Sequence, residues 1–149
     1  DLIARFRVEL SLLHRSDRPL DLEAARAEAA EYQQQGFSIT VAEDEAAGLV
    51  GYLVCRVAGD VVWAESLYVL PAYRRRGIAS ELYAEAEKLA RALGSDAPYN
   101  WVHPNNDAII QFLQRRGYNV LNLIELRRPY AGETPEQAIR VGQHDFKYG

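Results

Sequence analysis

The sequence predicts a single α/β domain over residues 1–149, with a mixed β-sheet and helices on both of its faces. Two observations carry this prediction. Apolar residues recur every three or four positions in the first 36 residues, as on one side of a helix, and every two positions from Phe37, as in strands. After about residue 70, helical and strand patterns alternate, which favours parallel strands covered by helices.

Two helices and three strands are expected in the first half of the chain. Leu2, Phe6 and Leu13 belong to one apolar helix face. Asp21 is a typical N-cap for a second helix, which Gly36 ends. Short turns rich in Gly and acidic residues then separate three strands, so an antiparallel meander should form. The expected strand ranges are 37–42, 49–57 and 61–70.

The second half of the chain is expected to continue as helix, strand, helix and strand. Residues 78–93 carry the clearest apolar helix stripe, which Gly94 ends. A short strand is expected at 99–102, and either Asn105 or Asn106 is expected to cap the next helix. The remaining expected elements are a last, weakly alternating strand at 118–126 and an irregular tail at 127–149.

Composition and charge exclude several classes of function. The formal net charge is −4, and a nucleic-acid binder needs a basic face, so no nucleic-acid partner is expected. No run of about eighteen apolar residues is present, so no membrane partner is expected. One cysteine, Cys55, excludes a disulfide framework, and the histidines lack the spacing of metal ligands. A cytoplasmic protein without a metal is the default expectation.

The segment from Arg74 to Ser80 is the strongest candidate for a binding site. It follows a strand and opens a helix, whose first turn presents N–H groups without partners and partial positive charge. Gly77 removes a side chain where the backbone would approach a ligand, and three consecutive arginines add charge. This combination suits a pyrophosphate group. Taken alone, however, a basic helix entry with a turn glycine is the simpler interpretation.

Two segments of the chain resemble the GNAT family (GCN5-related N-acetyltransferases). The first, ESLYVLPAYRRRGIA at 65–79, matches the family's strand, its (Arg/Gln)-x-x-Gly-x-(Gly/Ala) loop and the helix that follows. The second combines Asn106 with IIQF at 109–112 and RGY at 116–118. Direct resemblance covers residues 60–126. The family's opening strand is expected to precede residue 1 or to be absent.

The resemblance implies acetyl coenzyme A (acetyl-CoA) as the donor and a primary amine as the acceptor. The backbone of Leu67, Tyr68 and Val69 should lie beside the pantetheine arm, where a splay from the next strand leaves backbone groups open. The N–H of Val69 or Leu70 should polarise the thioester carbonyl. Asn106 matches an asparagine that contacts the arm, or else serves only as an N-cap. The residues expected around the pyrophosphate are Arg74, Arg75, Arg76, Gly77, Ile78, Ala79 and Ser80.

Glu65 is the candidate general base. The attacking amine must be neutral, and an alkylammonium with a pKa of about 10 must first lose a proton. Strand alternation puts Trp63 and Leu67 on the face of Glu65, and Ser66 and Tyr68 on the other. A carboxylate in so apolar a strand is costly if buried without purpose. The family often carries its base, acting through water, near this position. The alternative is a structural carboxylate bonded to a loop.

Leu113 departs from the family pattern. The family usually has there a tyrosine that protonates the departing thiolate, and leucine cannot donate a proton. Coenzyme A could leave as a thiolate, because a thiol is a fairly weak base. Alternatively a water or another hydroxyl donates the proton, the candidates being Tyr73, Tyr118 and Tyr130. A third outcome defines the alternative function, an acyl-CoA-binding module with little or no turnover.

The acceptor is the least constrained part of the prediction. The family acetylates small amines as well as peptides, and acceptor choice depends mainly on the first two helices and the late loops, where the resemblance is thinnest. A small-molecule or peptide amine is therefore expected. A homodimer is carried as an expectation of the resemblance, since dimers are common in the family.

Overall fold

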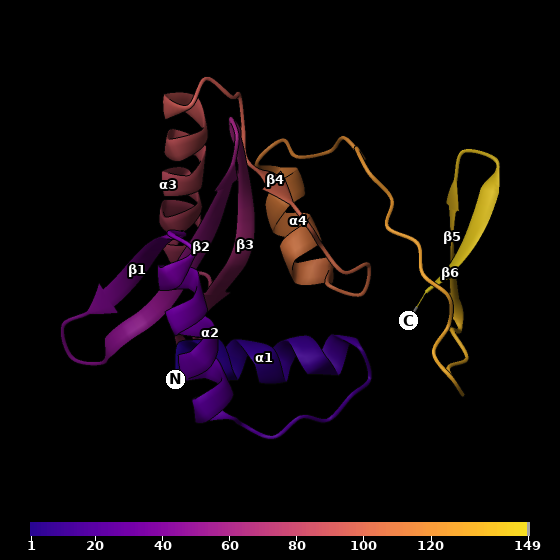
Figure 1. Ribbon diagram of the computed structural model, residues 1–149, viewed down its shortest axis with the longest axis horizontal. Coiled ribbons are helices and arrows are strands. Elements are labelled where there is room, and N and C mark those ends of the chain that lie inside the picture. Colours follow the sequence, from indigo (N-terminus) through magenta and orange to yellow (C-terminus); the bar gives the residue numbers. More distant parts are fainter. Residues whose placement is uncertain (149) are drawn as a thin grey trace. The chain divides into compact units, whose positions relative to one another are not determined.

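The computed structural model describes residues 1–148 (Figure 1). These residues divide into two compact units. One unit comprises residues 1–10 and 17–101, the other residues 11–16 and the chain from 102 onwards. The single domain over 1–149 stays a prediction. In chain order the elements are α1 (Leu2–Leu13), α2 (Leu22–Gln34), β1 (Ser38–Asp44), β2 (Gly48–Ala58), β3 (Val61–Val69), the 3₁₀ turn η1 (Pro71–Tyr73), α3 (Ile78–Ala92), β4 (Tyr99–Asn100), α4 (Asp107–Arg115), β5 (Gln137–Val141) and β6 (His144–Tyr148).

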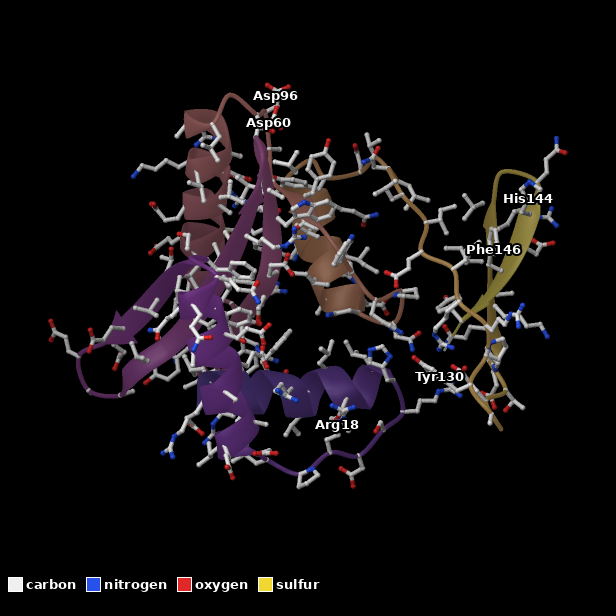
Figure 2. The ribbon with its side chains drawn as sticks, viewed as in Figure 1. Arg18, Asp60, Asp96, Tyr130, His144 and Phe146 are labelled. Atoms are coloured by element: carbon white, nitrogen blue, oxygen red, sulfur yellow. The ribbon has the colours of Figure 1, made fainter. Side chains whose placement is uncertain are left out.

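The first unit contains a four-stranded mixed sheet in the order β1-β2-β3-β4. β1, β2 and β3 form the expected antiparallel meander, and β4 runs parallel to β3. The turn between β2 and β3 contains Gly59 and Asp60, and Asp60 lies at its tip (Figure 2). The expected mixed sheet is therefore confirmed.

Helices cover both faces of this sheet, as the sequence predicted. Neighbouring residues of β2 alternate between two apolar clusters. Leu53 and Cys55 face α3, whereas Tyr52 and Val54 face α1 and α2. The helix residues in these clusters are Leu82, Ala86 and Ala90 of α3, Leu2 and Phe6 of α1, and Tyr32 of α2.

The helices begin and end at the residues that the sequence indicated. The Asp21 side chain accepts a hydrogen bond from the Ala24 N–H at 2.8 Å and so caps α2. Gly94 follows α3 with a φ of +82°, a conformation that favours glycine. The first 13 residues contain α1 and no strand. None of the helices within residues 1–148 is long and apolar enough to cross a bilayer.

The prediction of a strand at 118–126 is wrong. Residues 118–130 form neither helix nor strand, and Val120, Leu121 and Leu123 are exposed. The apolar residues of this segment occur in adjacent pairs, so neither face of a strand would be uniformly apolar. Such a segment has little to fix its register against a neighbouring strand, and the weak alternation was a poor signal.

The tail expected to be irregular instead contains a hairpin. β5 and β6 are antiparallel and are joined by Gly142 and Gln143, and Gly142 has a φ of +61°. Opposite each other in the ladder, Arg140 donates two hydrogen bonds to Asp145, at 2.8 and 2.9 Å. His144 and Phe146 lie two residues apart on β6 (Figure 2). Polar cross-strand pairs stabilise this hairpin. It contains few apolar residues, so the apolar pattern of the sequence did not predict it.

Leu82→Ala should lower the free energy of unfolding by about 2–5 kcal/mol, because truncating a buried leucine leaves a cavity. Leu82 is 4% exposed in the cluster between α3 and the sheet. Denaturant unfolding followed by circular dichroism measures the loss. Leu49→Ala is the control: Leu49 is 50% exposed on β2, and its loss should stay below about 1 kcal/mol. Equal losses in the two variants would contradict this core.

Candidate active site

A β-bulge at Glu65 interrupts the ladder between β2 and β3. Val54 pairs with Ser66, and the next β2 residue, Cys55, pairs with Ala64. Glu65 therefore has no partner residue on β2. An extra residue of this kind reverses the alternation of the strand beyond it. The bulge decides which side chains of β3 share a face with Glu65.

An ion pair with Arg56 of β2 holds the Glu65 side chain. The Arg56 Nε donates to Glu65 Oε1 at 2.5 Å, and the two side chains are 28% and 20% exposed. The guanidinium carbon also lies 5.6 Å from the Trp63 ring centroid and 5.9 Å from that of Trp101. Arg56 follows Val54 by two positions, so this pair lies on the α1/α2 side of the sheet. Glu65 therefore pairs with a side chain of a neighbouring strand and not with a loop.

The expected division of β3 into two faces is wrong beyond Glu65. Leu67 packs into the cluster on the α3 side, whereas Tyr68 packs with α1 and α2. Ser66 lies on the α1/α2 side too, because its hydroxyl is 2.8 Å from that of Tyr52. Strict alternation had placed Leu67 with Glu65 and the other two opposite. The bulge reverses the alternation beyond Glu65, so Glu65 shares its face with Ser66 and Tyr68.

The edge of β3 that faces away from β2 is open over its last residues. Among the strands of residues 1–148, β4 pairs with β3 only at Trp63 and Ala64. The Leu70 N–H donates to the Val50 carbonyl on β2 at 2.9 Å. By alternation, the backbone groups of Val69 point toward the open edge. Of the two N–H groups considered from the sequence, that of Val69 faces this edge and that of Leu70 is used within the sheet.

Arg74 is bound to the end of β3 and to α1. Its Nε donates to the Val69 carbonyl at 2.8 Å, and its Nη2 donates to Glu9 Oε2 at 2.6 Å. The Tyr68 hydroxyl donates to the other oxygen of Glu9 at 2.9 Å. Burial and this carboxylate raise the pKa of Tyr68 to about 12. Glu9 thereby connects α1 with both the strand and the loop.

Gly77 is required by the backbone conformation of the loop. It is the N-cap of α3 with a φ of +87°, a region that side chains with a Cβ rarely adopt. A Cβ at Gly77 would meet nothing within 4 Å in the chain, so the space above the backbone is open. Arg75 also has a positive φ, +63°. The Arg76 guanidinium lies 4.9 Å from the Tyr73 ring centroid.

The first turn of α3 offers backbone N–H groups to an anion. The Ser80 and Glu81 N–H groups donate to the Gly77 carbonyl at 2.8 and 3.1 Å. The N–H groups of Gly77, Ile78 and Ala79 precede these first helical bonds and belong to the end with partial positive charge. The helix start lies where the sequence predicted it, and a pyrophosphate bound there stays a prediction.

The second unit contains Asn106, Leu113 and the histidines His14 and His103. The Asn106 side chain accepts a hydrogen bond from the Ile109 N–H at 3.3 Å and caps α4, so a cofactor contact stays a prediction. Leu113 is buried within α4. The ring centroids of His103 and His14 are 4.1 Å apart, and burial, His14 and Arg127 lower the pKa of His103. No group of three or more metal-ligating side chains occurs within residues 1–148.

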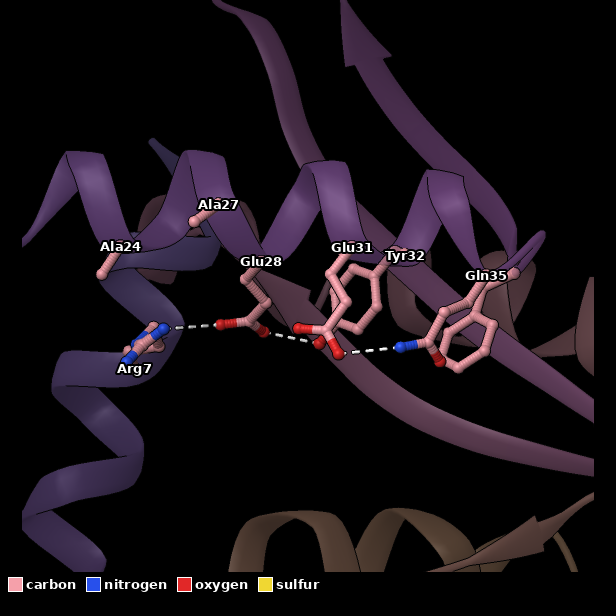
Figure 3. Close-up of a pocket in the computed structure, with 8 residues that line it drawn as sticks. Arg7, Ala24, Ala27, Glu28, Glu31, Tyr32 and Gln35 are labelled. Atoms are coloured by element: carbon pink, nitrogen blue, oxygen red, sulfur yellow. Dashed lines mark hydrogen bonds and ion pairs between the residues drawn. The ribbon is translucent and has the colours of Figure 1, made fainter.

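Sequence reasoning missed a pocket of about 500 Å³ beside α2 (Figure 3). Glu28 lies in its wall and accepts hydrogen bonds from the Arg7 guanidinium at 2.9 Å and the Tyr32 hydroxyl at 2.5 Å. Burial and this carboxylate raise the pKa of Tyr32 above its ordinary value. The sequence pattern that could have predicted this pocket is a stripe of polar and small residues at helical spacing along α2. Such a stripe is equally typical of a solvated helix face.

Comparison with a family model decides the family. The model described as the acetyltransferase (GNAT) family matches residues 5–118. The chain belongs to this family. This GNAT chain is therefore an acetyltransferase, and acetyl-CoA is the co-substrate that its membership implies. A search of curated proteins found no match.

Solved structures share the fold of this GNAT chain. The aminoglycoside N-acetyltransferase AAC(6')-Iy, in complex with the bisubstrate analog CoA-S-monomethyl-acetylneamine, is 22% identical with a TM-score of 0.60, covering 74% of this chain and 81% of that one. A mutant Bacillus halodurans protein is 21% identical with a TM-score of 0.65, covering 85% and 92%. A Trypanosoma brucei acetyltransferase is 18% identical with a TM-score of 0.58, covering 84% and 92%.

Cys55 should be inert as a nucleophile in this acetyltransferase. It is buried, and burial, together with the charge of Glu65, raises the pKa of its thiol to about 11. Because the thiolate is the reactive form, its reaction with Ellman's reagent at pH 8 should be on the order of 100-fold slower than in the unfolded chain. The same protein in guanidinium chloride provides the reference rate. Equal rates in the folded and unfolded chains would show that the thiol is accessible.

Proposed function

We propose that this protein transfers the acetyl group of acetyl-CoA to a primary amine by direct attack in a ternary complex. The observation that carries the proposal is the bulge at Glu65, which holds a carboxylate in the strand whose following residues form the open edge. The acceptor is a small molecule or a peptide, and residues 1–149 act as a single domain. An amine acceptor is also consistent with the fold shared with an aminoglycoside N-acetyltransferase.

The pantetheine arm of acetyl-CoA lies along the open edge of β3 in this proposal. The backbone groups of Leu67 and Val69 face that edge, while those of Tyr68 alternate toward β2. The Val69 N–H therefore donates to the thioester carbonyl and stabilises the oxyanion that forms during attack. Asn106 supplies a further contact to the arm.

The pyrophosphate of acetyl-CoA rests on the first turn of α3. The N–H groups of Gly77, Ile78 and Ala79 point toward it, and Ser80 adds a hydroxyl. The side chains of Arg75 and Arg76 supply positive charge at the mouth of this site. Arg74 acts mainly by shaping the loop, because its guanidinium is engaged by Glu9 and Val69.

Glu65 removes the proton that the amine must lose. The proton passes from the acceptor ammonium to the carboxylate, directly or through a water, and leaves a lone pair on nitrogen. This nitrogen forms a bond to the thioester carbon, the bond between carbon and sulfur breaks, and the nitrogen releases a second proton to water. The products are the acetylated amine and coenzyme A.

The thiolate of coenzyme A leaves without a proton from α4, because Leu113 has none to give. A thiol has a pKa of about 8.5, so the thiolate is an acceptable leaving group near neutral pH. The leucine at position 113, where the family usually has a proton-donating tyrosine, also favours a second candidate function, an acyl-CoA-binding module with little or no turnover. Release of free thiol in the presence of an amine separates the two.

Calorimetric titration with acetyl-CoA tests the cofactor site. We expect micromolar binding to the intact protein and a loss of affinity of at least about 30-fold in Gly77→Glu, which adds strain and a negative charge beside the pyrophosphate. Gly59→Glu is the matched control, because Gly59 also has a positive φ, +65°, but lies in the β2–β3 turn. Its affinity should stay within about twofold of the intact protein. No binding in the intact protein would refute both candidate functions.

Glu65→Gln tests the general base. A panel of neamine, spermidine and a lysine-containing peptide serves as acceptor, and thiol release gives the rate. We expect kcat to fall about 100-fold or more, because a positioned base contributes 10²–10⁴-fold, with the KM for acetyl-CoA nearly unchanged. Glu28→Gln, a carboxylate also paired with an arginine, is the control. A similar kcat in Glu65→Gln and the intact protein would assign Glu65 a structural role.

A further inference from the structure

We propose that Arg56 is a positioning residue for Glu65, which fixes one carboxylate oxygen and leaves the other open to the acceptor. The inference rests on the proposed function, in which Glu65 is the general base. Arg56 touches neither the acceptor nor acetyl-CoA in this proposal and acts only through the Glu65 carboxylate.

Two indole rings hold the Arg56 guanidinium in place. Arg56 lies opposite Trp63 in the ladder between β2 and β3, and the centroids of Trp63 and Trp101 are 5.0 Å apart. The guanidinium carbon is 5.6 and 5.9 Å from these two centroids. A planar guanidinium suits such stacking, whereas the ammonium of lysine is a compact, strongly hydrated charge. The aromatic rings therefore restrict the arginine independently of its ion pair.

The hydrogen bonds of Glu65 differ from those of the two other half-buried carboxylates on this side of the sheet. Glu9 uses both oxygens, one with Arg74 and one with Tyr68. Glu28 likewise uses both, with Arg7 and Tyr32. Arg56 occupies Oε1 of Glu65, and the hydrogen bonds of residues 1–148 leave Oε2 without a partner. Glu65 is thus anchored but keeps one oxygen able to accept a proton.

The bulge explains why Glu65 needs this anchor. The residue has no partner on β2, so the ladder places its backbone but a neighbouring side chain must fix its carboxylate. Burial, with a smaller contribution from the Glu65 charge, raises the pKa of Tyr32 of α2 and of Cys55 of β2, so both are neutral near pH 7. Arg56 supplies the positive charge that faces the carboxylate.

A double-mutant cycle tests the proposal with acetyl-CoA and the panel amine that the intact protein acetylates fastest. Arg56→Gln should lower kcat about 10- to 100-fold, because a misplaced catalytic group loses its reactive geometry, with the KM for acetyl-CoA within about twofold. In the Glu65→Gln background the same change should lower kcat by less than about twofold. A merely structural arginine would lower kcat equally in both backgrounds.

Three further variants serve as controls. Arg7→Gln breaks the ion pair with Glu28, whose side chains are 35% and 21% exposed, close to the 28% and 20% of Arg56 and Glu65. It should lower thermal stability about as much as Arg56→Gln does, while kcat stays within about twofold. Arg56→Lys keeps the charge but cannot stack or donate from Nε, so kcat should recover only partly. Trp101→Leu removes one ring at a side chain that is 65% exposed, so the fold should persist while kcat falls about threefold or more.

The outcomes distinguish a failure of the positioning role from a failure of the proposed function. Equal losses of kcat with and without Glu65, or full activity in Arg56→Gln, would overturn the positioning role and leave the proposed function intact. No thiol release by the intact protein with any panel amine would instead overturn the proposed function, and the positioning role with it. If Arg56→Gln does not fold, full activity in both Arg56→Lys and Trp101→Leu would be the overturning result.

Discussion

The extra residue at Glu65 is the constraint on which the first unit depends. Val62 and Ala64 face α3 before the bulge, and Leu67 and Val69 face α3 after it. Without the bulge, Leu67 and Val69 would turn away from α3. The apolar clusters on the two faces of the sheet therefore require a shift of register in this strand. The same shift leaves Glu65 without a partner in the ladder, so core packing and the candidate base are consequences of one feature.

Electrostatic compensation follows a common rule on the α1/α2 side of the sheet. Each half-buried carboxylate is paired with an arginine from another element: Glu9 with Arg74, Glu28 with Arg7, and Glu65 with Arg56. Removing a carboxylate from water is costly unless charge and hydrogen bonds replace the lost solvation. Tyrosine hydroxyls complete this replacement for Glu9 and Glu28. Glu65 is the exception, because Arg56 is the one hydrogen-bond partner of its carboxylate among the described residues.

Arg74 shows how the loop at Arg74–Ser80 is joined to the rest of the first unit. Its guanidinium connects the loop with the end of β3 through Val69 and with α1 through Glu9. The Val69 carbonyl that it contacts belongs to the residue whose N–H faces the open edge of β3. A shift of α1 would therefore move the Val69 backbone at the edge proposed to hold the thioester. The three arginines of the loop, equivalent in the sequence, have different surroundings in the fold.

Local signals in the sequence by themselves determined the helices, the meander, the loop at Arg74–Ser80 and the family. Caps such as Asp21 and the apolar stripe of α3 depend on residues a few positions apart, so the chain encodes them directly. Only the tertiary structure decided the bulge, the face of Leu67, the partner of Glu65 and the hairpin of the tail. These depend on which residues of two strands lie opposite each other. That register is fixed by packing and side-chain pairs across the sheet, which no periodicity within one strand contains.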